Sequence, residues 1–189
     1  MNGDTVQVEV LAFPGTGTSR IKLSSVDAGI DGAEESQCGA TDDRVASMDP
    51  RAARLLPVGC TGWLINDCSH CFLTAGHCTG NISVIQFNVP LSSSGGGLNN
   101  PPAADQYAID HSSLQSNGGQ GVGDDWGYFG TFPNAGTGLT AAQAQGAFYI
   151  LGTPPGQTTG NDIRITGYGV DGGTANQTQQ TNVGPLVNL

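Results

Sequence analysis

Four of the five cysteines in this chain lie within one short span, and that crowding is the strongest constraint on its fold. They are Cys60, Cys68, Cys71 and Cys78, and the fifth is Cys38. Two chemical causes explain such spacing: disulfides formed in an oxidising compartment, or thiolate ligands around a metal ion. The two causes imply opposite cellular locations, so the residues around the cysteines must decide between them.

The composition favours short strands over long helices. The chain of 189 residues contains 30 Gly and 10 Pro, and only 12% of its residues are charged. Gly and Pro favour tight turns, whereas surface helices carry charged faces. Strand-like runs at residues 126–132, 148–151 and 163–168 alternate with turn residues, and one short helix is predicted at 139–147. We therefore expect an all-β protein built as a barrel or a sandwich.

The charge balance excludes some partners. The formal net charge is -10, and the chain has only six Lys and Arg residues, which do not cluster. Nucleic-acid binding rests on clustered cations, so we expect no nucleic-acid partner. No stretch approaches the roughly 20 apolar residues that span a bilayer, so we expect no membrane partner. The acidity also gives weak support to a secreted, soluble protein.

The sharpest motif surrounds His77. The sequence reads Thr-Ala-Gly-His-Cys from residue 74 to 78, and Cys-Thr-Gly-Trp-Leu-Ile from residue 60 to 65. Together these segments resemble the region around the catalytic histidine of chymotrypsin-like (trypsin-like) serine endopeptidases. The resemblance implies that Cys60 and Cys78 form a disulfide and that His77 is the general base. A general base must be held in one rotamer near the nucleophile, and a neighbouring disulfide limits local movement.

A carboxylate precedes an aromatic run further along the chain. Residues 123–129 read Gly-Asp-Asp-Trp-Gly-Tyr-Phe. In the resembled family an Asp at the start of a strand orients the histidine, accepts its Nδ1 proton and stabilises the imidazolium. Asp125 matches that position better than Asp124, because Asp125 directly precedes Trp126 and Asp124 belongs to the Gly-rich turn. Without His77 upstream, both would be interpreted as solvated turn carboxylates.

The resemblance also implies a fold of two six-stranded β-barrels with the active-site cleft between them. Residues 1–48 would be an N-terminal lead-in segment, 49–135 the first barrel with His77 and Asp125, and 136–189 an incomplete second barrel. Residues 163–169, Ile-Arg-Ile-Thr-Gly-Tyr-Gly, resemble a segment early in the second barrel of the family. Residues 183–187 resemble, more narrowly, a strand and turn of bacterial glutamyl-endopeptidase-like members.

The nucleophile of such an enzyme has no candidate in this sequence. No serine follows Ser116, and no earlier serine has the Gly-x-Ser-Gly setting that would place an oxyanion hole beside it. We therefore expect the chain to stop before the nucleophilic serine of a parent endopeptidase. That parent would be secreted and monomeric, would act on a protein or peptide and would need no cofactor or metal, while these 189 residues alone would be inactive.

A zinc site is the alternative explanation for the cysteines. Cys68, Cys71, His77 and Cys78 together form a possible zinc knuckle. Adjacent His and Cys side chains converge poorly on one tetrahedral ion, however, and Cys60 would be left over. With the outer pair bridged as the family pattern implies, Cys68 and Cys71 are expected to form a second disulfide across the hairpin corner.

Two other functions stay open at this point. One is a non-catalytic binding or adaptor module of the same trypsin-like fold, and the other is a reduced, zinc-holding intracellular domain. Cys38 has no partner in the expected pairing and would bond to a cysteine outside this chain.

Overall fold

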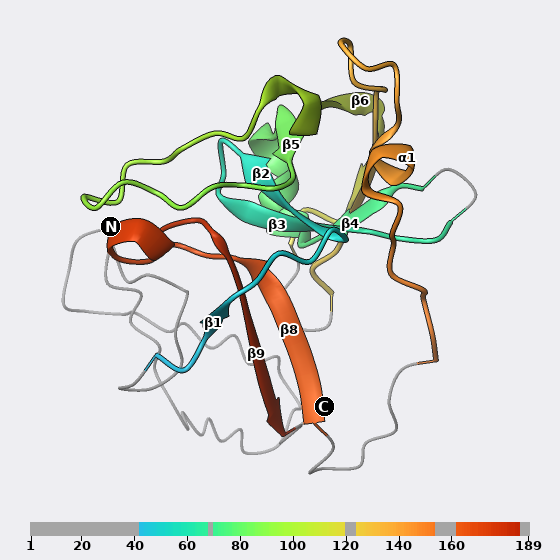
Figure 1. Cartoon of the computed structure of the whole chain (residues 1–189). Helices are drawn as coiled ribbons and strands as arrows, with labels where there is room; N and C mark the ends of the chain where they lie inside the picture. The colour runs from blue at the N-terminus through green and yellow to red at the C-terminus, as the bar shows by residue number, and fades with distance from the viewer. Residues whose placement is uncertain (1–41, 68–69, 120–123, 154–161, 186–189) are drawn as a thin grey trace, which may run out of the picture. The chain divides into compact units, whose positions relative to one another are not determined.

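The computed structural model describes residues 42–67, 70–119, 124–153 and 162–185. In these residues the protein is mostly β, with one closed barrel and one three-stranded sheet (Figure 1). The expected all-β class is therefore confirmed. Most of the expected lead-in segment at residues 1–48 lies outside the described part of the chain.

Six antiparallel strands close the barrel in the order β2, β3, β4, β7, β6, β5. Each strand pairs with two neighbours, so this sheet has no open edge. The whole barrel falls inside the range 49–135, where the sequence led us to expect the first barrel. The strands are β2 (Ala52–Leu56), β3 (Cys60–Leu64), β4 (Phe72–Thr74), β5 (Val84–Gln86), β6 (Gln106–Ser116) and β7 (Gly127–Thr131).

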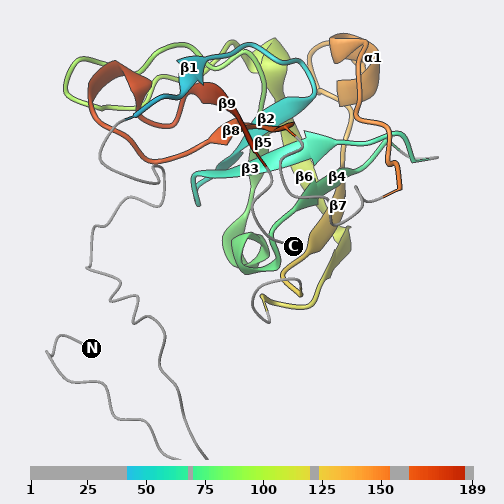
Figure 2. The same cartoon turned by 90° about the horizontal axis from the view of Figure 1, so that it is seen from below.

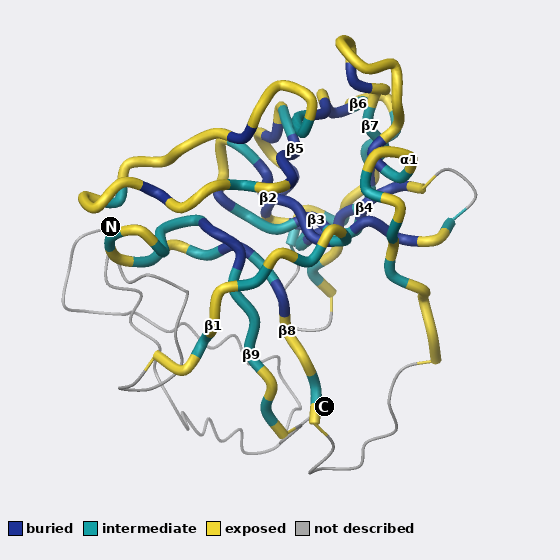
Figure 3. The backbone as a smooth tube through the Cα atoms, in the orientation of Figure 1, coloured by how far each residue is buried: buried dark blue, intermediate teal, exposed yellow. Residues whose placement is uncertain are grey.

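Aromatic rings fill the interior of the barrel. Phe72 and Phe129 are stacked with ring centroids 5.4 Å apart, and Phe87 meets Tyr107 edge-on at 5.9 Å. All four side chains are fully buried, and Figure 3 shows the buried backbone concentrated in the barrel strands. The barrel thus has a packed core on which surrounding loops can be held in place.

A second sheet combines segments from before and after the barrel. Strand β9 (Gln179–Pro185) lies between β1 (Val45–Ala46) and β8 (Asp162–Tyr168). Strand β1 falls in the range expected for the lead-in segment, yet it pairs with β9 through Val45 and Thr181. The region before residue 49 therefore contributes a strand to the C-terminal sheet.

Hydrogen bonds attach this sheet to the barrel. The indole N–H of Trp63 donates to the carbonyl of Thr166 at 2.9 Å, and the N–H of Tyr168 donates to Oγ1 of Thr61 at 2.7 Å. Thr61 and Trp63 both belong to β3. The hydroxyl of Thr61 also donates to the carbonyl of Tyr168 at 3.3 Å. One barrel strand consequently carries all three of these bonds to β8.

The short helix predicted at 139–147 is confirmed as α1 (Ala141–Gln145). The hydroxyl oxygen of Thr140 accepts the N–H of Gln143, and the side chain of Gln143 accepts the N–H of Thr140, so the helix begins with a capping box. No helix in the described part of the chain has the length and apolar composition that a membrane crossing requires. The remaining helical turns are 3-10: η1 (Gly76–Asn81), η2 (Ala103–Asp105) and η3 (Gly173–Ala175).

The prediction of a strand at residues 148–151 is wrong. This segment makes only an isolated parallel bridge, between Ile65 and Tyr149. Strand β3 is already paired on both sides, with β2 and with β4. Only the backbone at the C-terminal end of β3 is free to pair with another segment. Residues 148–151 therefore pair with it at one point and do not form a strand.

We predict that the Phe72–Phe129 stack is a major source of stability. Replacing Phe129 by Ala leaves a cavity in the barrel centre and should lower the free energy of unfolding by about 3–5 kcal/mol. Phe132→Ala is the control, because Phe132 is 53% exposed, and we expect a change of about 0.5 kcal/mol or less. Urea denaturation of both variants measures the difference, and equal losses would contradict this account of the core.

Candidate active site

His77 lies on η1, the turn that directly follows β4. The hydroxyl of Thr79 donates to the carbonyl of Gly76 at 2.7 Å and closes this turn. Cys78 is buried and forms a disulfide with Cys60 on β3, so the predicted bridge is confirmed. Figure 2 shows η1 as a green coil, which contacts β6 and β7. The turn is thus attached to the barrel in two ways: it continues from β4, and its Cys78 is disulfide-bonded to β3.

Asp125 meets His77 through both carboxylate oxygens. The backbone N–H of His77 donates to Oδ1 at 2.9 Å, and Nδ1 of the imidazole lies 2.6 Å from Oδ2. The two residues are separated by 48 positions in the sequence. The structure therefore brings together the pair that the sequence singled out. Asp124, the rejected neighbour, instead accepts a hydrogen bond from Asn117.

The carboxylate of Asp125 is kept in its charged form. The backbone N–H of His77, followed by its imidazole, holds the pKa of Asp125 below the usual value, and the backbone N–H of Gly76 adds to this effect. A charged oxygen beside Nδ1 favours the tautomer with its proton on Nδ1. The Nε2 atom of His77 is then left with a lone pair that can accept a proton.

The two side chains differ in their exposure to solvent. The side chain of His77 is 58% exposed, whereas that of Asp125 is 26% exposed. A reacting group can therefore approach the imidazole, while the carboxylate that orients it is more sheltered.

Two glycines allow the surrounding backbone to come close to the pair. Gly119 has a φ of 77°, and a Cβ at this position would lie 3.0 Å from Cβ of His77 and 3.2 Å from Oδ1 of Asp125. At Gly76 a Cβ would lie 2.8 Å from the carbonyl oxygen of Trp126. Larger residues would push these segments apart. In the sequence Gly76 lies inside the Thr-Ala-Gly-His-Cys motif without a role of its own, and the run Asn-Gly-Gly at 117–119 indicates only a turn.

Among the described residues, Ser116 has a hydroxyl group close to this site. That hydroxyl is already hydrogen-bonded to backbone carbonyl groups. It bonds the carbonyls of Gly76 at 3.3 Å and Trp126 at 3.2 Å. Among the described residues, His77 makes no hydrogen bond to a serine hydroxyl.

The predicted bridge between Cys68 and Cys71 is wrong, because Cys71 has a free thiol. Cys68 itself lies outside the described residues. The side chain of Cys71 is buried, and a Cβ built on Gly130 of β7 would lie 3.6 Å from its Sγ. Cys71 thus packs against a neighbouring barrel strand. Burial raises the pKa of this thiol, which makes it poorly reactive.

The Cys60–Cys78 disulfide argues against the alternative of a zinc site. Ligand atoms of Cys60, His77 and Cys78 lie within 4.8 Å of one another. Zinc requires thiolates, however, and the two sulfurs of this group are bonded to each other. In the oxidised protein His77 is the only member of the group that retains a ligand atom.

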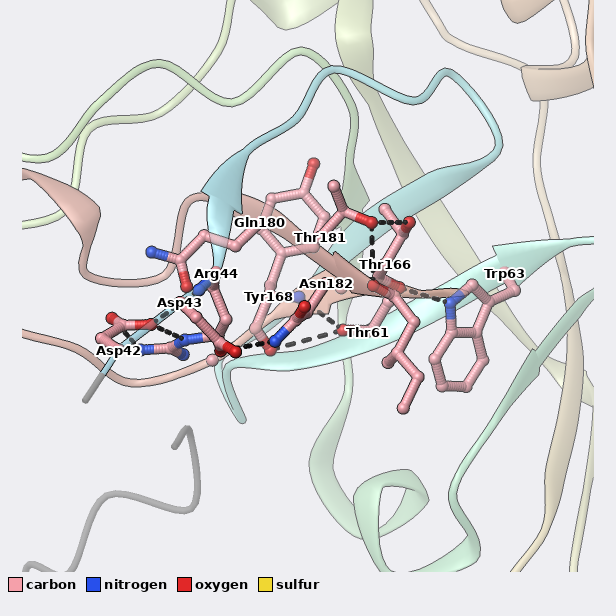
Figure 4. Close-up of a pocket in the computed structure, with 13 residues that line it drawn as sticks. Asp42, Asp43, Arg44, Thr61, Trp63, Thr166, Tyr168, Gln180, Thr181 and Asn182 are labelled. Atoms are coloured by element: carbon pink, nitrogen blue, oxygen red, sulfur yellow. Dashed lines mark hydrogen bonds and ion pairs between the residues drawn. The ribbon is translucent and has the colours of Figure 1, made fainter. Parts of the chain in front are cut away.

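A cavity of about 440 Å³ lies between β3 and the C-terminal sheet, and Figure 4 shows the residues around it. Neither His77 nor Asp125 lines it. Arg44 at its rim is paired with Asp42 and Asp171 at 2.7 Å each. Asp43, which also lines the cavity, accepts a hydrogen bond from Asn182. The charged side chains at this cavity are therefore already partnered, and the cavity is separate from the histidine site.

No protein-family model matches this chain, and no curated protein sequence matches it. The evidence for a function therefore lies in the geometry around His77. That geometry has three parts: a sheltered charged carboxylate, an accessible imidazole, and a disulfide adjoining the turn that carries it.

We predict a specific cysteine pattern in the oxidised protein. After unfolding without reductant and treatment with iodoacetamide, Cys60 and Cys78 should remain linked, and Cys71 should be alkylated. Peptide mapping by mass spectrometry measures both. Alkylation of Cys60 and Cys78 in protein purified without reductant would instead favour the reduced, zinc-holding alternative.

We also predict a pH-dependent contribution of Asp125 to stability. Its folded pKa is below the ordinary value of 3.8, so the contact with His77 stabilises the fold above about pH 4 and is lost as the pH falls through the lower folded value. Urea midpoints of the native protein and of Asp125→Asn should differ near pH 6 and converge as the pH falls below the folded pKa of Asp125. Asp162→Asn, at the exposed start of β8, is the control. A difference that grows on acidification would contradict the proposed charge state.

Proposed function

We propose that this chain forms the histidine- and aspartate-bearing part of a secreted, chymotrypsin-like serine endopeptidase. The observation that carries the proposal is the double contact between His77 and Asp125 beside the Cys60–Cys78 disulfide. This arrangement suits acyl transfer, because an oriented imidazole can take the proton of a nucleophile and later give it to the leaving amine.

In this proposal His77 is first the general base and then the general acid. Its Nδ1 is used by Asp125, so Nε2 takes the proton from a serine hydroxyl as the oxygen attacks the peptide carbonyl. The imidazolium then protonates the leaving amine, and an acyl-enzyme remains. In the second half-reaction Nε2 takes a proton from water as its oxygen attacks the acyl carbonyl. The imidazolium then returns the proton to the serine oxygen as the acid product leaves. The charge on Asp125 stabilises the imidazolium in both halves.

The nucleophile in this proposal is a serine outside the 189 residues. It would lie in a Gly-x-Ser-Gly segment, whose backbone N–H groups would also bind the oxyanion of the tetrahedral intermediate. Protein or peptide is the proposed substrate, and neither a cofactor nor a metal is part of the proposed reaction.

The proposal extends to the fold. The closed barrel would be the first of two barrels, and the sheet of β1, β9 and β8 would begin the second. One observation supports this: the sheet packs on β3 through Thr61 and Trp63.

The rival is a non-catalytic module of the same fold. A module that only binds a partner does not need a charged carboxylate against the Nδ1 of a histidine. The short contact at 2.6 Å therefore favours catalysis. The residue at the serine position of the longer polypeptide separates the two functions.

A fluorophosphonate probe, which reacts with activated serines, tests the proposal. We expect no labelling of the 189-residue chain and stoichiometric labelling of a polypeptide that carries this chain together with the serine segment. His77→Ala in the longer polypeptide should slow labelling by about a thousandfold or more.

The matched control is His111→Ala in the same polypeptide. His111 is exposed on β6 and does not contact Asp125, so its loss should leave the labelling rate unchanged. Labelling of the 189-residue chain, or equal rates in the His77 and His111 variants, would contradict the proposed mechanism.

A further inference from the structure

The side chain of Asn117, just after β6, holds the backbone on both sides of Asp125. Its Oδ1 accepts the N–H of Trp126 at 3.1 Å. Its Nδ2 donates to the carboxylate of Asp124 at 2.6 Å and also to the carbonyl of Asp124. The residues immediately before and after Asp125 are thus bound by one carboxamide.

The same carboxamide reaches the segments around His77. Its Oδ1 also accepts the N–H of Gly119 at 3.3 Å, and Gly119 packs against both His77 and Asp125. A Cβ at Gly76 would lie 2.6 Å from this oxygen. Asn117 therefore contacts the start of the turn that carries the histidine as well as the segment that carries the aspartate.

We infer that Asn117 is a positioning residue whose carboxamide directs the carboxylate of Asp125 toward His77. Asn117 does not touch the imidazole or a reacting atom, so it acts through Asp125. Its relevance to peptide hydrolysis rests on the proposed function, but the positioning itself is a property of this chain.

The loss of Asn117 should disturb the contact between Asp125 and His77 more than it disturbs the folding of the chain. Asn117 is only partly buried, so water can replace it at the N–H of Trp126 and the carbonyl of Asp124. The side chain of Asp125 is 26% exposed, so it can then rotate away from His77 into solvent. The barrel core, in contrast, contains none of these groups.

Nuclear magnetic resonance of the 189-residue chain tests this inference through two signals of His77. One is the low-field resonance of the Nδ1 proton, which reports the bond to Oδ2 of Asp125, and the other is the exchange rate of the backbone N–H bonded to Oδ1. In Asn117→Ala we expect the Nδ1 resonance to be lost to exchange with water. The backbone N–H should exchange about tenfold faster or more.

Asn134→Ala is the matched control. Oδ1 of Asn134 accepts the N–H groups of Gly136 and Thr137 at 2.9 Å each, so it organises a loop in the same way in the segment after β7. This variant should leave both His77 signals unchanged. Unchanged signals in Asn117→Ala, or equal changes in Asn134→Ala, would overturn the inference.

A second variant covers the case in which Asn117→Ala does not fold. Asn117→Asp keeps an acceptor for the N–H groups of Gly119 and Trp126 but replaces the donor to Asp124 with a second carboxylate. Repulsion between the two carboxylates should displace the segment around Asp125 and remove the Nδ1 signal. An intact signal in this variant would overturn the inference.

The fluorophosphonate experiment separates this inference from the proposed function. If the longer polypeptide is labelled, Asn117→Ala should slow labelling by about tenfold to a hundredfold, because a misdirected base raises the barrier. If the longer polypeptide is not labelled but the signals of His77 still depend on Asn117, the proposed function fails and the positioning role stands. If labelling occurs and Asn117→Ala changes neither signal nor rate, the positioning role alone fails.

Discussion

The pairing of β4 with β7 is the constraint on which the histidine site depends. In this antiparallel pair Thr74 lies opposite Gly127, so the residues just after β4 and just before β7 emerge at the same end of the barrel. His77 follows β4 and Asp125 precedes β7. Their contact is therefore a consequence of barrel closure, although they are 48 positions apart in the sequence. Gly127 permits this closure, because a Cβ there would lie 2.4 Å from Cγ2 of Thr79.

His77 and the outer disulfide could be predicted because residues 60–65 and 74–78 resemble a known family motif. Asp125 could be predicted only because that resemblance called for a carboxylate at the start of a later strand. The strand β2 could not be predicted, because Ala-Ala-Arg-Leu-Leu consists of helix formers and lacks β-branched residues. The longest strand, β6, is a mostly polar run and gave no clear alternation. Asn117 was missed for a different reason: its role depends on long-range contacts, whereas Asn-Gly-Gly by itself indicates only a turn.

The burial of Arg54 could not be predicted from the pattern of apolar residues in the sequence. It is fully buried on β2, and burial lowers its pKa, although an arginine stays charged over the whole ordinary pH range. Its guanidinium donates to the side chain of Gln86 at 2.6 Å, and to the backbone carbonyls of Asn99 at 2.9 Å and Gln177 at 3.1 Å. These carbonyls belong to a long loop and to the segment before β9. A charged residue in the interior thus links the barrel to the parts of the chain around it, and such a link raises the cost of separating them.

Strand β3 connects the histidine site to the C-terminal sheet. Cys60 at its start is bonded to the turn that carries His77, while Thr61 and Trp63 bond β8. Because side chains alternate along a strand, Gly62 and Leu64 face the opposite side and are buried in the barrel. Any movement of the C-terminal sheet would therefore pull on β3, whose other face is packed in the barrel core. Such a strand resists movement, so β3 holds the turn that carries His77 and strand β8 at a fixed separation.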